Sequence, residues 1–187
     1  MADFTELEGQ LRECFGRVVY THKTHEKMAD RCAATLRFYK MAQIVTSVVS
    51  AGSASLAVML DADAIKVLTA VAAIGSSGIS IYMKSFDPGA TAQKHRDAAA
   101  SIWPIRESYL SLLTDLRMQR IDSDAAVKRR DELQAKLAAI YKGAPQTDGK
   151  AYAEAQKALK VYEDYTFSDA EIDAFLPAQL KKGQKNP

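Results

Sequence analysis

Two long, uncharged apolar stretches dominate the hydropathy pattern of the chain, Met41–Leu60 and Val67–Met83, with only residues 61–66 between them. A helix needs about 20 apolar residues to cross the hydrocarbon core of a bilayer, which is about 30 Å thick. A helix of a soluble protein normally keeps one polar face, whereas these stretches carry no charge on any side. The pattern therefore predicts a transmembrane hairpin with spans at 41–60 and 64–83.

Lysine and arginine residues flank the predicted hairpin on both outer sides. The connecting turn differs from these flanks because it carries Asp61 and Asp63 with Lys66 as its one basic residue. By the positive-inside rule, this asymmetry places both termini in the cytoplasm and the turn outside. The competing interpretation is a pair of fully buried helices within a soluble bundle.

Outside the hairpin, turn and capping signals divide the chain into helices. An apolar stripe with helical spacing precedes the first span, so we expect one helix to run from the cytosolic segment directly into it. Phe86-Asp-Pro-Gly89 is a strong break. A second cytosolic helix is expected after it, from about Thr91 to Arg120, with a kink at Pro104.

Three further capping signals predict the remaining helices. Asp122-Ser-Asp124 opens a helix that ends at Gly143, Thr147-Asp-Gly149 precedes another, and Ser168-x-x-Glu171 opens a short helix with Ile172, Phe175 and Leu176 as its buried side. No strand-like alternation is longer than a few residues. The predicted fold class is all-α, an integral membrane protein with a two-helix transmembrane hairpin and a cytosolic helical bundle. Its parts are a cytosolic lead-in (1–40), the hairpin (41–83), a cytosolic helical region (84–182) and a flexible tail (183–187).

Composition and charge narrow the function classes. The net charge is +2 without a basic tail, so we predict no nucleic-acid partner. Cys14 and Cys32 match no zinc or redox spacing and are predicted to be free thiols. The lead-in has no early apolar core followed by a small-residue cleavage site, so no signal peptide is predicted and the first span directs insertion.

Small and hydroxylated residues repeat every four positions in both spans. They are Ser47, Ala51 and Ser55 in the first span and Ala72, Ser76 and Ser80 in the second. Such spacing lets helices approach closely and lets serine hydroxyls bond across them. One interpretation is that these residues only hold the two helices of the hairpin together. The other is that several hairpins associate through this face, either by packing or around a water-filled pathway. Neither apolar stretch, Met41–Leu60 or Val67–Met83, contains a charged residue, which argues against a proton relay or a charge-selective filter.

Enzymatic interpretations find little support in the sequence. His22 and His25 could share one helix face, with Glu26 or Asp30 nearby as a third zinc ligand, but charged helix faces commonly contain such clusters. The chain has no phosphate-binding glycine loop outside the spans, no nucleophile motif and no paired-carboxylate arrangement. We therefore predict a non-enzyme without metal or cofactor.

The helix after the hairpin carries the most distinctive motif of the chain. Its members are His95, Arg96, Trp103, Arg106, Glu107, Tyr109 and Asp115. Adjacent residues do not face each other on a helix, so Arg106 and Glu107 are not expected to pair. Trp103 and Tyr109 are expected to pack, with a polar partner from a neighbouring helix for the indole N–H and the phenol O–H. The helix is predicted to hold a polar network that serves as a regulatory or subunit contact.

The hairpin, its helical lead-in and this ordered motif resemble the SLATT family of bacterial two-transmembrane effectors, over roughly residues 10–165. The resemblance implies a place in the inner membrane and partners such as a nucleotide second messenger or its synthase or sensor protein. It also implies a homo-oligomer, in contact with lipid, that forms a pore or disrupts the membrane in antiviral defence. A membrane scaffold for a cytosolic partner and, third, a membrane-bound metallohydrolase using the histidines are the alternatives.

Overall fold

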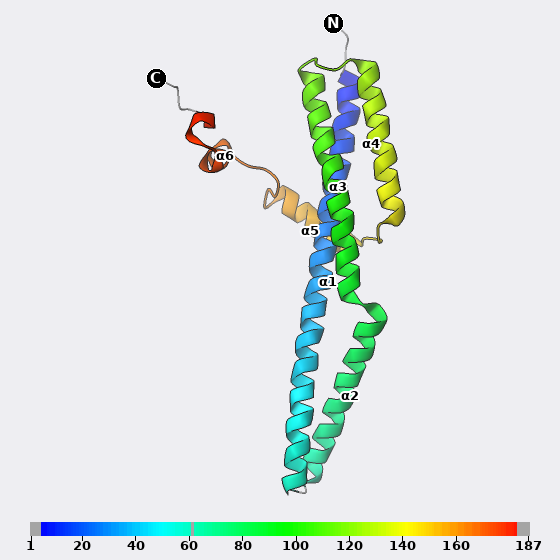
Figure 1. Cartoon of the computed structure of the whole chain (residues 1–187), viewed down its shortest axis with the longest axis vertical. Coiled ribbons are helices and arrows are strands. Elements are labelled where there is room, and N and C mark those ends of the chain that lie inside the picture. Colours follow the sequence, from blue (N-terminus) through cyan, green and yellow to red (C-terminus); the bar gives the residue numbers. More distant parts are fainter. Residues whose placement is uncertain (1–4, 61, 183–187) are drawn as a thin grey trace.

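The computed structural model describes residues 5–60 and 62–182 of the chain (Figure 1). Its elements are α1 (Thr5–Leu60), α2 (Asp63–Phe86), α3 (Pro88–Arg117), α4 (Ser123–Gly143), α5 (Gly149–Lys160), α6 (Asp169–Phe175) and a 3-10 helix, η1 (Ala178–Leu180). Helices make up 86% of the structure and the described residues contain no strand. The all-α prediction is confirmed; Asp61 and the predicted tail 183–187 lie outside the described residues.

One continuous helix, α1, runs the length of the molecule. Its first half packs with α3 and α4 in an upper bundle, and its second half packs with α2 in a lower hairpin (Figure 1). The prediction of one helix that runs without a break from the N-terminal segment through residues 41–60 is confirmed. The absence of proline between Thr5 and Leu60 permits this continuity, because proline would remove a backbone donor and clash with the preceding turn.

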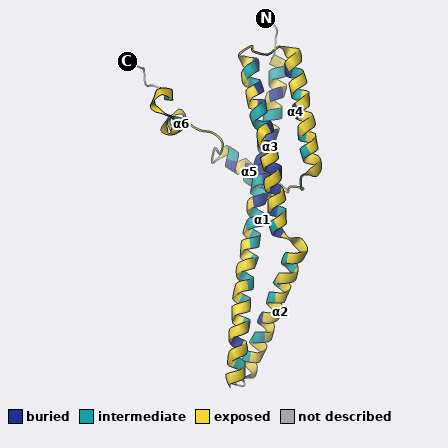
Figure 2. Ribbon diagram, in the orientation of Figure 1, coloured by how far each residue is buried: buried dark blue, intermediate teal, exposed yellow. Residues whose placement is uncertain are grey.

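Most residues of the lower hairpin are exposed (Figure 2), and they include large apolar ones such as Val48, Val58, Val71 and Ile74. Both of its helices are long and apolar enough to cross a membrane, and only 6% of each apolar window is buried. A core helix of a soluble protein would show the reverse, with most of its apolar residues covered. The hairpin therefore has the surface that a lipid environment requires, which agrees with the predicted spans.

A single residue, Asp87, separates α2 from α3. Its φ of 35° lies in the left-handed region, and its side chain accepts a hydrogen bond from the Ala90 N–H at 2.9 Å. Pro88 follows at the first position of α3, where a missing N–H costs nothing. The predicted break is confirmed, although α3 starts at Pro88 rather than near Thr91 and continues through Pro104.

The upper bundle has one apolar core formed by α1, α3 and α4. Its buried members are Leu11, Val18, Ile102, Ile105, Tyr109, Leu112, Leu116, Ala126 and Leu133. The Asp122 side chain caps α4 by accepting from the Ala125 N–H at 2.8 Å. Asp148 caps α5 in the same way and also binds Arg31 of α1 at 2.7 Å, so the capping residue fixes α5 on the bundle.

The last helix, α6, projects away from the bundle (Figure 1). The predicted capping box of Ser168 and Glu171 is present. The predicted buried side is wrong: Ile172 is 42% and Phe175 is 82% exposed, and Leu176 is half-buried. The residues have the spacing of one helix face, but no other helix of the described chain covers that face.

Tyr109 offers a test of the core. Its hydroxyl is buried and has no hydrogen-bond partner among the described residues, contrary to the expectation of a polar partner. Burial raises the pKa of Tyr109 to about 12. Tyr109→Phe should leave the free energy of unfolding unchanged or raise it by about 1–2 kcal/mol, because an unsatisfied buried group is removed. Ile102→Ala, which opens a cavity in the same core, should lower it by about 2–5 kcal/mol. Denaturation in detergent measures both; a marked loss in Tyr109→Phe would contradict this account.

Candidate functional site

The three histidines of the chain lie together where α1 meets α3. His25 and His95 are almost fully buried, and their Nδ1 atoms lie 2.9 Å apart in a hydrogen bond between the two helices. Such a bond needs one ring nitrogen as donor and the other as acceptor. Burial, with repulsion from His95 and His22, lowers the pKa of His25 to about 4. Burial also lowers the pKa of His95, so the pair is neutral at pH 7.

Tyr165, in the connection between α5 and α6, reaches back onto α1 and α3. Its hydroxyl donates to Glu26 Oε2 at 2.5 Å and lies 3.1 Å from His22 Nδ1. The Lys23 ammonium and the Arg106 guanidinium lie over its ring, each 4.5 Å from the ring centroid. Together with Asp164, which pairs with Lys23 at 2.8 Å, these residues form what we call the Tyr165 clasp.

Mutual pairing stabilises the charges of the clasp despite their burial. Burial alone would raise the pKa of Glu26, but hydrogen bonds from Tyr165 and Lys23 hold that pKa below its usual value. Burial opposes the charge of Lys23 as well, and hydrogen bonds to Asp164 and Glu26 nevertheless raise its pKa. His22 differs, because burial lowers its pKa more than Glu26 raises it. The clasp is therefore a charged cluster around a neutral histidine and a neutral tyrosine.

The backbone of the clasp adopts an unusual conformation. Glu163 and Tyr165 have φ values of 53° and 73°, in the left-handed region that side chains other than glycine rarely occupy. Such conformations cost free energy and persist only where surrounding contacts hold them. The contacts of Tyr165 and Asp164 with α1 and α3 supply that stabilisation.

Arg106 makes a contact that the sequence argument denied. Its Nη2 lies 2.8 Å from Oε1 of Glu107, and its Nε donates to the same oxygen at 2.9 Å. Two adjacent backbone positions do point apart, but both side chains are long enough to bend around the helix and meet. Its Nη1 is buried without a hydrogen-bond partner among the described residues, so one donor of this guanidinium is unused.

A groove of about 650 Å³, the Trp103 groove, lies beside the clasp. Arg96, Trp103, Arg106 and Tyr165 contribute to its walls, with Glu26 on the α1 side. Trp103 is 51% exposed, so the expectation that it packs in the bundle is wrong. Asp30 and Glu26 also line the groove, so two carboxylates accompany its two guanidinium groups, and its exposed indole is suited to stacking on a flat group rather than to holding helices together.

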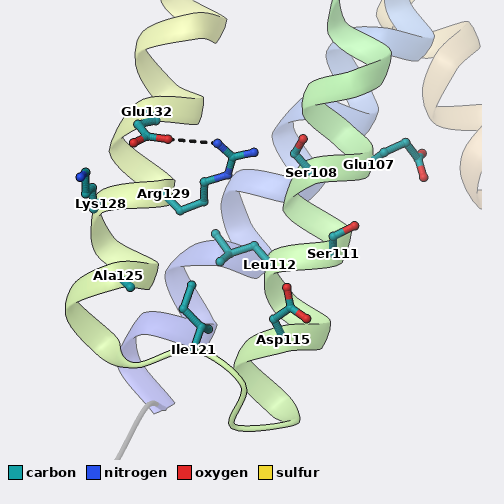
Figure 3. A pocket seen from close by; sticks show the side chains of 10 residues that line it. All are labelled: Glu107, Ser108, Ser111, Leu112, Asp115, Ile121, Ala125, Lys128, Arg129 and Glu132. Atoms are coloured by element: carbon teal, nitrogen blue, oxygen red, sulfur yellow. Dashed lines mark hydrogen bonds and ion pairs between the residues drawn. The ribbon is translucent and has the colours of Figure 1, made fainter.

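The other predicted motif residues lie apart from the clasp. Tyr109 belongs to the core of the bundle. Asp115 and Glu107 line a second groove of about 560 Å³, between α3 and α4, in which Arg129 pairs with Glu132 at 3.0 Å (Figure 3). The motif on α3 thus contributes to four environments, not to a single site: the histidine pair, the clasp with its Trp103 groove, the core and the second groove.

Sequence reasoning missed half of the clasp. Lys23, Asp164 and Tyr165 belong to no recognisable motif, and Tyr165 is far from α1 and α3 in the sequence. The histidines were considered as metal ligands, but His25 binds His95 and His22 contacts Tyr165. In the described residues, no group of three or more His, Cys, Asp or Glu side chains is placed to hold a metal ion.

In the hairpin, hydroxyl groups form the polar contacts between α1 and α2. Ser47 and Ser76 are hydrogen-bonded at 3.0 Å, and Gln43 donates to Ser80 at 2.9 Å. Thr69 donates to Ser53 at 2.7 Å, a pair absent from the predicted repeat. Of the other predicted positions, Ala72 is buried, whereas Ala51 and Ser55 are exposed.

An outward-facing apolar hairpin joined to a polar helical bundle defines a two-span helical membrane protein. Residues 7–171 match the family model of the SMODS and SLOG-associating 2TM effector domains, family 4. The chain belongs to this SLATT family, which makes it a membrane effector domain of conflict and defence systems and confirms the resemblance. No curated protein and no solved structure matches the chain.

The histidine pair makes stability depend on pH. Because the pKa of His25 is about 4 in the folded chain and about 6.5 when unfolded, the unfolded chain binds more protons between these values. Stability is therefore highest above pH 6.5 and falls towards pH 4. From pH 7 to pH 5, His25 alone should account for a loss of about 2 kcal/mol. His25→Gln should flatten the profile measured by thermal unfolding in detergent; a flat wild-type profile over this range would contradict the neutral pair.

The clasp hydroxyl should control how firmly the C-terminal segment is held. Tyr165→Phe removes the donor to Glu26, a hydrogen bond to a charged group, so hydrogen exchange of residues 161–168 should accelerate about 10- to 100-fold. Tyr162→Phe is the matched control, because this exposed tyrosine contacts Lys157 only through its ring in the described structure. Equal exchange rates in the two variants would show that the Tyr165 hydroxyl does not hold the segment.

Proposed function

We propose that this chain is an inner-membrane effector that oligomerises and permeabilises the membrane when a cytosolic trigger acts on its helical bundle. Both termini are cytoplasmic in this arrangement, and the hairpin contacts lipid. The observation that carries the proposal is the continuity of α1, which holds the clasp near its middle and the first span at its end. From Glu26 to Met41 the helix rises about 22 Å without a break.

Continuity makes the bundle and the hairpin one mechanical unit. The clasp and the histidine pair both hold α1 against α3, and α3 joins α2 through Asp87 alone. A change in the packing of α1 on α3 must therefore alter how α1 and α2 meet in the bilayer. A trigger has this effect only if it binds one arrangement better than the other.

The Trp103 groove supplies suitable chemistry for a nucleotide second messenger as the trigger. Guanidinium groups bind phosphates in a bidentate manner, and exposed aromatic rings stack on bases. Arg96, Arg106 and Trp103 bring both kinds of group to one groove. A synthase or sensor protein that delivers the nucleotide, or docks on this surface itself, is the corresponding protein partner.

The residue types in the hairpin favour association of the membrane spans over selective ion transport. No Asp, Glu, Lys, Arg or His lies in the apolar stretches Met41–Leu60 and Val67–Met83, and Lys66 stands at the turn end of the second span. A passage formed by several hairpins would therefore be lined mainly by hydroxyl groups and apolar atoms. Hydrogen bonds between helices in a membrane contribute only about 0.6 kcal/mol each on average. The contacts of Ser47 with Ser76 and of Gln43 with Ser80 are therefore weak enough to exchange between copies.

Inducible expression in a bacterium, followed with a membrane-potential dye, tests the proposal. Depolarisation or dye entry after induction is the expected result. An intact potential with the chain correctly inserted would overturn it and favour a scaffold that recruits a cytosolic partner.

The face of α2 that contains Ser76 provides the sharper comparison. Ser76→Leu should abolish toxicity while insertion persists, because the side chain replaces the hydroxyl that meets Ser47 and holds the helices apart. Ser77→Leu is the matched control, since Ser77 is exposed and bonds to the Ala73 carbonyl of its own helix. Equal toxicity of both variants and the wild type would show that the Ser76 face is not used.

A further inference from the structure

The helix α6 displays an apolar face outside the membrane that nothing in the described chain covers. Phe167, Ile172, Phe175 and Leu180 are 42–82% exposed. Isolated helices shorter than about 12 residues are marginal in water, and α6 has only seven. Its capping box fixes one end but buries no apolar area. The helix therefore needs a surface to pack on.

A surface of matching character lies on the same molecule between α1 and α3, and Leu159 of α5 and residues 164–166 line one end of it. Two adjoining hollows of about 370 and 430 Å³ share Phe15 and Leu110, and Val19 and Leu113 extend them. Leu110 is 48% exposed, so this Phe15 groove also presents apolar area to water. It begins beside the clasp, at Arg106, and ends at Arg12 and Arg117.

Length and charge fit the helix to the groove. Seven residues of helix rise about 10.5 Å, which is also the rise of α3 from Leu110 to Arg117. The guanidinium groups of Arg12 and Arg117 are about two-thirds exposed and share Glu8, which leaves one net positive charge at that end. The helix carries three acidic residues, Asp169, Glu171 and Asp173, and the pairing of Lys182 with Asp169 at 2.8 Å leaves a net charge of two negatives. An acidic amphipathic helix thus faces an apolar groove with a basic end.

We infer that α6 of one copy docks into the Phe15 groove of a second copy. Within one chain, the clasp fixes Tyr165 on α1 and the following residues lead away from the bundle (Figure 1). Copies inserted in the same direction hold equivalent parts at the same height above the bilayer. Figure 1 shows α6 beside the upper bundle along the long axis, level with the N-terminal part of α1 and the C-terminal half of α3. A neighbour in the membrane plane therefore presents its groove at the height of α6.

Such a contact joins different surfaces of the two partners. Each copy offers one helix and accepts one, so the association is heterologous and continues until a ring closes or an open array forms. The inference rests on the proposed function in that it supplies the contact through which the effector oligomerises. It also gives the clasp a role, since the clasp fixes where α6 leaves the bundle.

Cysteine cross-linking between two differently tagged chains tests the contact. In a Cys14→Ser, Cys32→Ser background, one chain carries Phe175→Cys and the other Leu110→Cys, and both are co-expressed in membranes. Oxidation should give a disulfide-linked dimer that contains both tags. Val161→Cys in place of Phe175→Cys is the matched donor control, because Val161 is similarly exposed but precedes the clasp; it should give at least about fivefold less dimer.

Charge exchange provides a second, independent measurement. Arg117→Glu in the acceptor chain should lower the cross-linked yield about fivefold, the scale of one exposed ion pair, and Asp173→Arg in the donor chain should restore it. A chain with both cysteines that forms only an internal disulfide would overturn the inference in favour of folding back. Equal yields for Phe175→Cys and Val161→Cys would also overturn it.

The outcomes separate this inference from the proposed function. Depolarisation without the mixed dimer would leave the effector function standing and remove the α6 contact. The mixed dimer without depolarisation would establish the contact and overturn permeabilisation.

Discussion

The whole structure depends on one constraint: a single helix, α1, must be stable with one half in water and the other half in lipid. Helix α1 is 56 residues long, about 84 Å at the usual rise, of which a bilayer core accommodates about 30 Å. Its first half must therefore be covered by a bundle in water, while its second half needs only lipid and one partner helix. Helices α2, α3, α4 and α5 all pack against it.

The clasp lies on the water-exposed half of α1 because charged pairing at this density needs partial solvation. Lys23, Glu26 and Asp164 are close enough to compensate one another, and removing one would leave buried charge without a partner, which costs more than the pair contributes. The clasp is therefore held as a unit. A segment held by one cooperative polar unit is either docked or released, which is the behaviour that a control element requires.

Local signals along the chain predict most of the secondary-structure elements. The apolar spans, the break at Asp87 and the caps at Asp122, Asp148 and Ser168 were all predictable, because each depends on residues adjacent in the chain. The candidate functional site is harder to predict from the sequence. His95 and Arg106 belong to the predicted motif, but His95 bonds to His25 of α1 and Arg106 lies over the ring of Tyr165. No local pattern pairs residues so distant in sequence.

The errors have a common physical cause as well. Helical spacing predicts packed faces for Trp103, Ile172 and Phe175, because large apolar residues at that spacing are usually buried. Burial needs a second surface, however, and spacing within one helix carries no information about whether such a surface is near. The same limitation hid the contact of Arg106 with Glu107, since backbone spacing ignores the reach of long side chains.

Bonds of very different strength hold the two halves of the molecule. Neutral hydroxyl contacts join α1 and α2 in the hairpin, whereas charge-assisted hydrogen bonds and a buried histidine pair join α1, α3 and the C-terminal segment in the bundle. Charge-assisted bonds are about twice as strong as neutral ones. A perturbation strong enough to rearrange the bundle therefore exceeds what the hairpin contacts can resist. Under the proposed function, the spans follow the bundle, so the bundle is the control element and the hairpin gives the response in the membrane.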